Sequence, residues 1–172
     1  MWTNIESMYM YSPVGISLEK AEKVAAFDLD WTLVKPKNTV FPRNTTDNYI
    51  MTNRIPLLKK YIDLGYTIVI FSNQKLTPKE KLEFKIARMN DIINKFSKEE
   101  VYPFIFMATG DDGYRKPNVG MWTEFRRMAP NIKFGFYCGD MAGRPGDHSD
   151  SDLQFAKNIP IDFYIPEVVF GV

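Results

Sequence analysis

Four short polar motifs in this chain carry side chains suited to phosphoryl chemistry. Asp28 and Asp30 end the first of several apolar runs, Ser72 ends the second, and Asp140 follows the fourth after a single glycine. Lys116 lies ahead of that fourth run. Two neighbouring carboxylates, a hydroxyl, a cation and a further acid are together the groups that phosphate-ester hydrolysis needs.

The spacing of Asp28 and Asp30 suits a two-step hydrolysis. One carboxylate can attack phosphorus and form an acyl phosphate, while the other protonates the leaving oxygen and then activates water. Asp140, together with Asp28 and a backbone carbonyl near Asp30, offers the oxygen ligands that Mg²⁺ takes in proteins. Ser72 and Lys116 suit binding of the phosphoryl oxygens. These residues predict a magnesium-dependent phosphatase with Asp28 as nucleophile and Asp30 as acid and base.

Each motif alone also has a simpler explanation. An Asp-X-Asp after a strand is usually a solvated turn or a helix cap, and Ser-Asn, a single lysine and Gly-Asp are all common in loops. The combination favours function because all four features stand at a strand end or strand approach, where open parallel sheets bind ligands.

The elements that must position these residues alternate along the chain. Apolar runs rich in Ile, Val, Phe and Tyr predict buried strands at 24–29, 67–71, 104–107, 134–138 and 163–165. A helix is predicted to begin at Thr77 and to run through Phe96, and shorter helices are predicted at 56–64, 119–128 and 149–157. This alternation predicts an α/β fold, a three-layer α/β/α sandwich around a mostly parallel sheet.

The length of 172 residues and a 45% hydrophobic content predict one compact domain. We expect residues 1–22 to be an N-terminal extension packed on a domain of residues 23–172. Only 39 residues separate Thr32 from Ser72, and 43 separate Ser72 from Lys116. Predicted helices and strands fill both intervals, so we expect no large cap domain.

Charge and cysteine content narrow the function classes. The chain has 22 Lys and Arg against 21 Asp and Glu, so a net charge of +1 provides no extended field for binding long nucleic acid, and any such contact must be local. The single cysteine, Cys138, cannot form an internal disulfide or a cysteine-rich zinc site. No apolar run reaches the roughly 20 residues of a membrane span. We expect a soluble, intracellular monomer without structural zinc or membrane contact, in the nucleus or the cytoplasm.

The motifs resemble those of a known superfamily. Asp28-Leu29-Asp30-Trp31-Thr32, Ser72, Lys116 and Gly139-Asp140 are similar to the four motifs of the haloacid dehalogenase (HAD) superfamily. Longer segments, at 40–42, 70–74, 114–117 and 139–145, resemble the phosphatase domain of the polynucleotide kinase 3′-phosphatase family. The resemblance runs from about Lys23 to the C-terminus.

The resemblance implies an Mg²⁺-dependent enzyme that removes a 3′-phosphate from nucleic-acid ends, as in DNA repair. We expect DNA ends more than RNA ends, although the sequence does not decide between them. By motif position, Asp28 would be nucleophile and metal ligand, Asp30 the acid and base with its carbonyl on the metal, and Asp140 the remaining ligand. Ser72 and Lys116 would bind the phosphate. Candidates for contact with the substrate strand are Phe41, Asn73, Gln74, Arg115 and Arg144.

The sequence also departs from this family. Glycine usually stands where this chain has Trp31, and we expect the indole to pack, with stacking on a terminal base as the alternative. The segments after Gln74 and Pro145 are shorter than in the family, which leaves the preference between single and double strands open. We expect His148 to be an exposed loop residue. No Gly-Lys dipeptide occurs, so the phosphate loop of a 5′-kinase is not predicted.

Two other functions remain open. One is a small-molecule phosphatase of the same superfamily, although such relatives often carry a cysteine and histidine zinc loop that this chain lacks. The other is a catalytically silent module that binds nucleic-acid ends or proteins. Retention of both Asp28 and Asp30 argues against a pure binder, because two carboxylates would repel phosphate.

Overall fold

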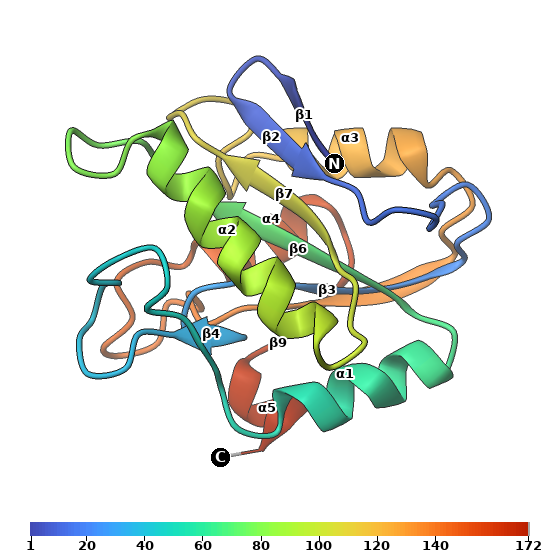
Figure 1. The fold of residues 1–172 in the computed structure, drawn as a ribbon. Coiled ribbons are helices and arrows are strands. Elements are labelled where there is room, and N and C mark those ends of the chain that lie inside the picture. Colours follow the sequence, from blue (N-terminus) through green and yellow to red (C-terminus); the bar gives the residue numbers. More distant parts are fainter. Residues whose placement is uncertain (172) are drawn as a thin grey trace.

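A computed structural model describes residues 1–171. Its centre is a seven-stranded sheet with the strand order β1-β2-β7-β6-β3-β8-β9 (Figure 1). The five strands from β7 to β9 are parallel, and β1 and β2 add antiparallel to the β7 edge. The strand bounds are β1 Trp2–Ile5, β2 Met8–Tyr11, β3 Lys23–Phe27, β6 Thr67–Asn73, β7 Phe104–Ala108, β8 Phe134–Cys138 and β9 Asp162–Tyr164.

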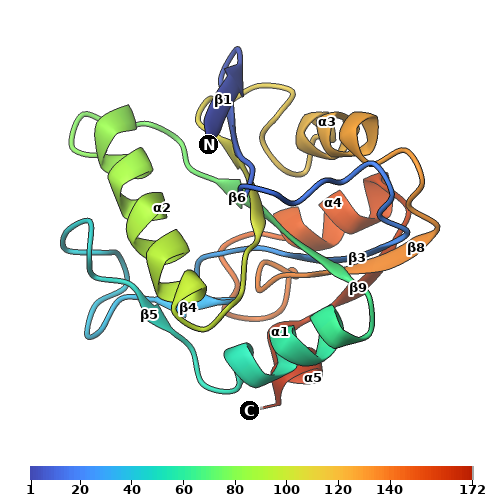
Figure 2. The same ribbon diagram turned by 45° about the vertical axis from the view of Figure 1, so that its right-hand side comes forward.

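Helices cover both faces of the sheet, as the alternation of elements predicted. Their bounds are α1 Arg54–Asp63, α2 Leu82–Ser97, α3 Gly120–Met128, α4 Ser151–Asn158 and α5 Pro166–Phe170. Figures 1 and 2 show α1, α2 and α5 on one face and α3 with α4 on the other. The predicted three-layer sandwich with a mostly parallel sheet is therefore confirmed.

The strand sequences explain the two faces. Successive side chains of a strand point to opposite sides, and both sides are buried in a covered parallel sheet. In β3, Ala25 and Phe27 join the core under α1 and α2, while Val24 and Ala26 join the core under α3 and α4. A strand of this kind must be apolar throughout, which is why the predicted strands read as continuous apolar runs.

The insertions between the sheet strands are small. After β3, a two-stranded sheet of β4 (Val34–Lys35) and β5 (Tyr49–Ile50) brackets a loop at 36–48. Between β6 and β7 the single element is α2. Within the described residues 1–171 there is no large cap domain over the end of the sheet. Nor does any helix in this range have the length and apolar character needed to cross a membrane.

Three local features differ from the sequence expectation or were not anticipated. Helix α2 begins at Leu82, so the predicted start at Thr77 was wrong. Thr77 does accept a hydrogen bond from the Glu80 N–H (2.9 Å), but its own N–H donates to the Glu80 carbonyl (3.1 Å), which closes a separate turn before the helix. Strand β6 extends through Asn73, and residues 2–11, given no strands from sequence, form the β1 and β2 pair. The boundary at residue 23 stays a prediction.

The aromatic packing around Phe71 gives a test of the core. This side chain is fully buried in β6, with ring centroids 5.3 Å from Phe106, 5.5 Å from Phe155 and 5.8 Å from Phe125. Phe71→Ala should lower the free energy of unfolding by roughly 3–5 kcal/mol in urea denaturation. Val168→Ala, at an exposed position, should change it by less than about 0.5 kcal/mol. Equal effects of the two substitutions would contradict this placement of the core.

Candidate active site

The carboxyl ends of three neighbouring strands bring the predicted residues together. Phe27, the last residue of β3, pairs with Ile70 of β6 and Cys138 of β8. The next residue, Asp28, continues this ladder, because its N–H donates to the Cys138 carbonyl at 2.9 Å. Asp28, Ser72 and Asp140 therefore lie at one edge of the sheet, where open parallel sheets bind ligands.

A buried lysine forms the centre of this edge. The Lys116 ammonium lies 2.9 Å from Asp28 Oδ1 and 2.9 Å from Asp152 Oδ1. It also donates to the Phe71 carbonyl (2.8 Å) and to the Tyr137 hydroxyl (2.7 Å). Lys116 is 3% exposed. An ammonium has three protons, so these four acceptors saturate it.

The charged groups of this cluster shift one another's pKa. Burial alone would lower the pKa of Lys116, but the carboxylates of Asp152 and Asp28 outweigh burial and raise it, so the ammonium stays charged. Burial, and then the charge of Asp152, raise the pKa of Asp28 well above its usual range, although Lys116 acts in the opposite direction. One ammonium therefore does not balance the acids around it.

Three carboxyl groups of this edge could hold a metal ion. Asp28, Asp140 and Asp152 each offer one oxygen, and these oxygens lie within 4.8 Å of one another. Burial raises the pKa of Asp140 as well. Hard oxygen donors in negative excess fit a divalent cation such as Mg²⁺, which would favour the ionised carboxylates. Both oxygens of Asp152 are engaged, Oδ1 by Lys116 and the Tyr137 hydroxyl and Oδ2 by the Met141 N–H, so the freer ligands are Asp28 and Asp140.

Asp152 was not anticipated from sequence, and Gly139 explains how it reaches the site. A Cβ built on Gly139 would lie 2.4 Å from Asp152 Cγ, so only glycine lets the first turn of α4 approach this strand end. Asp152 then accepts a hydrogen bond from the Met141 N–H (3.0 Å) and from the Tyr137 hydroxyl (2.6 Å). In the sequence, Asp152 could have been noticed as an acid next to apolar residues within the predicted helix 149–157.

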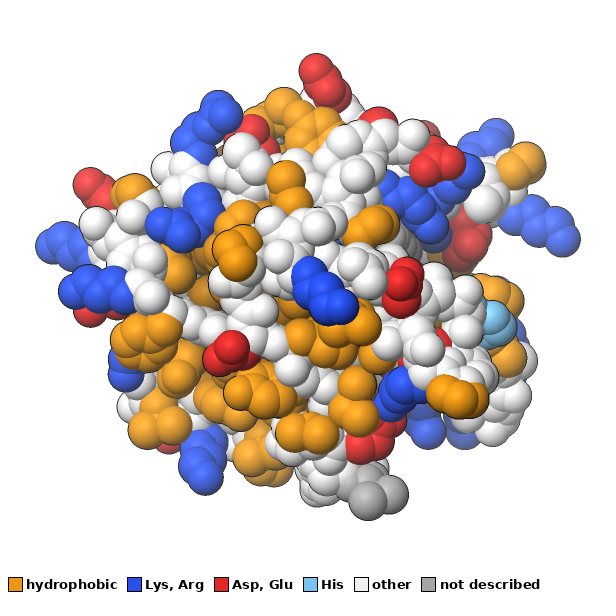
Figure 3. All heavy atoms as spheres, turned by 180° about the vertical axis from the view of Figure 1, so that it is seen from behind, with side chains coloured by type: hydrophobic (Ala, Val, Ile, Leu, Met, Phe, Trp, Pro, Cys, Tyr) orange, Lys and Arg blue, Asp and Glu red, His pale blue; other side chains and the backbone are white. Residues whose placement is uncertain are grey.

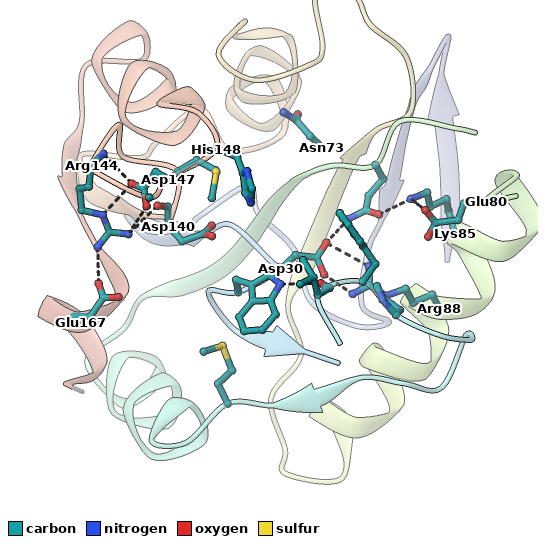
Figure 4. Close-up of a pocket in the computed structure, with 18 residues that line it drawn as sticks. Asp30, Asn73, Glu80, Lys85, Arg88, Asp140, Arg144, Asp147, His148 and Glu167 are labelled. Carbon is teal, nitrogen blue, oxygen red and sulfur yellow. Dashed lines mark hydrogen bonds and ion pairs between the residues drawn. The ribbon is translucent and has the colours of Figure 1, made fainter. Parts of the chain in front are cut away.

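Asp30 lies in a different electrostatic environment. Its carboxylate is paired with both terminal nitrogens of Arg88 from α2 and accepts a hydrogen bond from Gln74 Nε2 at 2.9 Å. Burial would raise the pKa of Asp30, but the charge and hydrogen bonds of Arg88, with the Gln74 bond, lower it below its usual value. Figure 4 shows Asp30 turned toward α2, across the cavity from Asp140.

A cavity of about 540 Å³ opens between Asp30 and Asp140. Asp28, Ser72 and Lys116 are buried and are not among its lining residues. Of the candidate substrate residues, Phe41, Asn73, Gln74 and Arg144 line it, and Arg115 is not among its lining residues. Phe41 is 76% exposed at this cavity. The others have protein partners, so they shape the cavity walls in this structure.

Those partners are specific. Gln74 also donates to the Ser72 hydroxyl at 2.7 Å, and Ser72 is buried behind it. The Asn73 side chain hydrogen-bonds the backbone N–H and carbonyl of Lys116 (2.8 and 3.1 Å), and so fixes the segment that carries the lysine. Arg144 pairs with Asp147 at 2.9 Å and Glu167 at 3.1 Å, as Figure 4 shows.

Trp31 and His148 also line the cavity. Trp31 has φ +61°, a backbone conformation that favours glycine, and its indole N–H donates to the Val40 carbonyl at 3.1 Å. The ring is 38% exposed and lines the cavity. His148 is exposed at the same cavity, as expected for a loop residue.

Known proteins resemble this chain over most of its length. The model of the family described as polynucleotide kinase 3 phosphatase matches residues 23–170. The bifunctional polynucleotide phosphatase/kinase of Schizosaccharomyces pombe is 37% identical over 98% of this chain, which spans 42% of that protein. The polynucleotide 3′-phosphatase of Saccharomyces cerevisiae is 30% identical, with 88% of this chain and 89% of that protein covered.

A solved structure shows the same fold. The D,D-heptose 1,7-bisphosphate phosphatase of B. bronchiseptica, complexed with magnesium and phosphate, superposes with a TM-score of 0.66. It is 18% identical, and the match covers 83% of this chain and 79% of that one. At this identity the similarity supports the architecture alone.

The buried ion cluster predicts a large loss of stability when its cation is removed. Lys116→Met should leave Asp28 and Asp152 without a counter-charge and lower the free energy of unfolding by roughly 3–5 kcal/mol at neutral pH. The variant raises the folded-state pKa of Asp28 further, so the loss should shrink as the pH falls toward about 4. Urea denaturation at neutral pH and at lower pH values measures this loss of unfolding free energy.

Lys133→Met is the matched control for that measurement. Lys133 pairs with Glu22 at 3.4 Å, but both side chains are more than half exposed. Its loss should leave the unfolding free energy nearly unchanged at every pH. Equal effects at Lys116 and Lys133 would contradict the buried cluster.

Proposed function

The chain belongs to the polynucleotide kinase 3 phosphatase family, and on that basis we propose that it hydrolyses the 3′-phosphate of nucleic-acid ends with Mg²⁺ as its cofactor. The observation that carries the proposal is the cluster of Asp28 with Lys116 and Asp152, placed at the end of β3 beside an open cavity that Asp30 lines. The relatives from Schizosaccharomyces pombe and Saccharomyces cerevisiae act on polynucleotides or their 3′-phosphates, as their names state.

Asp28 would act as the nucleophile. One of its oxygens forms a bond to phosphorus while the bond from phosphorus to the 3′-oxygen breaks, and the electron pair passes to the 3′-oxygen. That oxygen takes a proton from the carboxyl group of Asp30, giving a 3′-hydroxyl and a phosphorylated Asp28. Lys116 keeps its charge next to Asp28 and would offset part of the negative charge gathered there.

Water completes the reaction in the second step. It gives a proton to the Asp30 carboxylate as its oxygen attacks phosphorus, and the bond to Asp28 breaks to release inorganic phosphate. The low pKa of Asp30 suits this second role directly. For the first role Asp30 must be protonated, which an incoming phosphate dianion would favour by raising its pKa.

Bound Mg²⁺ would neutralise charge on the phosphate and polarise it toward attack. Asp28 and Asp140 would hold it through their carboxylates, and we infer from motif position that the Asp30 carbonyl is a further ligand. The excess of carboxylates over Lys116 supports a cation at this place.

The open cavity supports a polymer end as substrate. Its rim includes the exposed rings of Trp31 and Phe41, which could contact a terminal nucleoside. On the face that Figure 3 shows, turned 180° from Figure 1, basic and acidic side chains are interspersed, which favours contact limited to the strand end. We propose DNA rather than RNA as the main substrate, with Ser72, Asn73, Arg115 and Arg144 as further candidate contacts.

A substrate comparison tests the activity. Hydrolysis of an oligonucleotide 3′-phosphate should exceed that of its 5′-phosphate isomer and of an aryl phosphate, and chelation should abolish it. Asp28→Asn should remove turnover by several orders of magnitude, with little change in the melting temperature. A preference for the 5′ isomer, or no preference over the aryl ester, would favour a small-molecule phosphatase. No hydrolysis of any ester would favour a binding module.

Metal binding can be tested without turnover. Mg²⁺ at about a hundredfold above its Kd should raise the melting temperature of the unmodified protein by roughly 5–10 °C. Asp140→Asn should remove most of this rise, because it removes a proposed ligand. Asp63→Asn, an exposed acid on α1, should keep it. An equal rise in all three proteins would place the ion elsewhere.

A further inference from the structure

Helix α2 carries two cations on the face that packs against the sheet. Lys85 and Arg88 are buried in the same stripe as Met89, Ile92 and Phe96. Charged residues are rarely buried in such a stripe unless they have partners, and both of these residues reach from the helix toward the cavity. The polar contacts of this stripe are therefore specific features of the helix.

Arg88 holds the Asp30 carboxylate in a defined plane. Its two terminal nitrogens contact the two carboxylate oxygens of Asp30, with the Nη1 to Oδ2 distance 3.3 Å. We call this pair of contacts the fork. Behind it, Arg88 Nε donates to Asn48 Oδ1 at 2.8 Å. The Arg88 side chain is 3% exposed and that of Asp30 is 36% exposed. A planar guanidinium fixed on its inner side therefore presents the acid to the cavity.

A second set of hydrogen bonds holds the Asp30 carboxylate. Gln74 Nε2 donates to Asp30 Oδ2 at 2.9 Å. Lys85 Nζ in turn donates to Gln74 Oε1 at 3.2 Å, which orients the amide so that its nitrogen faces Asp30. Two residues of α2, one acting through Gln74, thus restrict both oxygens of a side chain whose exposed surface faces the cavity.

We propose that Arg88 is a positioning residue, which aims the Asp30 carboxyl at the leaving 3′-oxygen and then at the attacking water. This inference rests on the proposed function. Proton transfer to oxygen requires hydrogen-bond contact and alignment, and a misplacement of about 1 Å can cost on the order of a hundredfold in rate. The hydrogen bonds of Arg88 go to Asp30 and Asn48, and none of them involves the Asp28 cluster.

The test is Arg88→Met, which keeps most of the apolar stem and removes the fork. With an oligonucleotide 3′-phosphate, kcat should fall by roughly a hundredfold while KM changes little. With para-nitrophenyl phosphate the phenolate leaves without a proton, so the first step is spared and the second is slowed. Stopped-flow absorbance should then record a burst of about one phenolate per enzyme before slow turnover, as expected for an accumulating acyl phosphate.

Arg127→Ala is the matched control. Arg127 pairs with Glu124 on α3 and is 71% exposed, so its loss should change neither the kcat nor the burst. Added methylguanidinium should restore part of the kcat of Arg88→Met. If Arg88→Met fails to fold in a thermal melt, Arg88→Lys keeps the charge without the fork and should give the same burst with a smaller loss.

Two results would overturn the inference. One is an unchanged kcat in a folded Arg88 variant. The other is an equal fall for the oligonucleotide and the aryl ester with no burst, which would make Arg88 a residue that holds α2 against the sheet. If the unmodified protein cleaves the aryl ester but no 3′-phosphate, the proposed substrate fails, and the burst alone decides the role of Arg88.

Discussion

The buried ion pair of Lys116 with Asp28 and Asp152 is the constraint on which the site depends. Its ammonium lies in the interior, so removing it would leave two carboxylates without a partner at a cost of roughly 3–5 kcal/mol. Three segments far apart in sequence must meet to form it: the end of β3, the loop before α3 and the first turn of α4. The Asn73 side chain secures the second of these segments by bonding the Lys116 backbone on both sides.

Around this cluster the two acids of the first motif are separated into different environments. Burial and neighbouring carboxyls raise the pKa of Asp28, whereas Arg88 and Gln74 lower that of Asp30 despite its partial burial. Such a divergence between adjacent acids is the arrangement that lets two carboxyls take different roles. The charge deficit lies on the Asp28 side, where a divalent cation would favour the ionised nucleophile.

Much of this arrangement follows from sequence, and the rest depends on how helices pack. The apolar runs predicted the parallel strands, and a parallel sheet brings the ends of β3, β6 and β8 to one edge. Asp152, Lys85 and Arg88 escaped prediction because they lie within helices, where a single polar residue in an apolar stripe resembles a surface position until the packed face is known. The start of α2 was misplaced since Thr77 caps a turn instead of the helix. Gln74, taken as a contact for substrate, has its amide engaged by Asp30, Ser72 and Lys85.

The most direct test of the account is to identify the covalent intermediate. The protein would be mixed with Mg²⁺ and an oligonucleotide 3′-phosphate, quenched in acid within the first turnover, digested and analysed by mass spectrometry. We expect one phosphoryl group on the peptide that contains residues 24–33, located on Asp28. A phosphoryl group on another residue, or full turnover with none detected on Asp28 under conditions that preserve acyl phosphates, would contradict the central role of the Asp28 and Lys116 cluster.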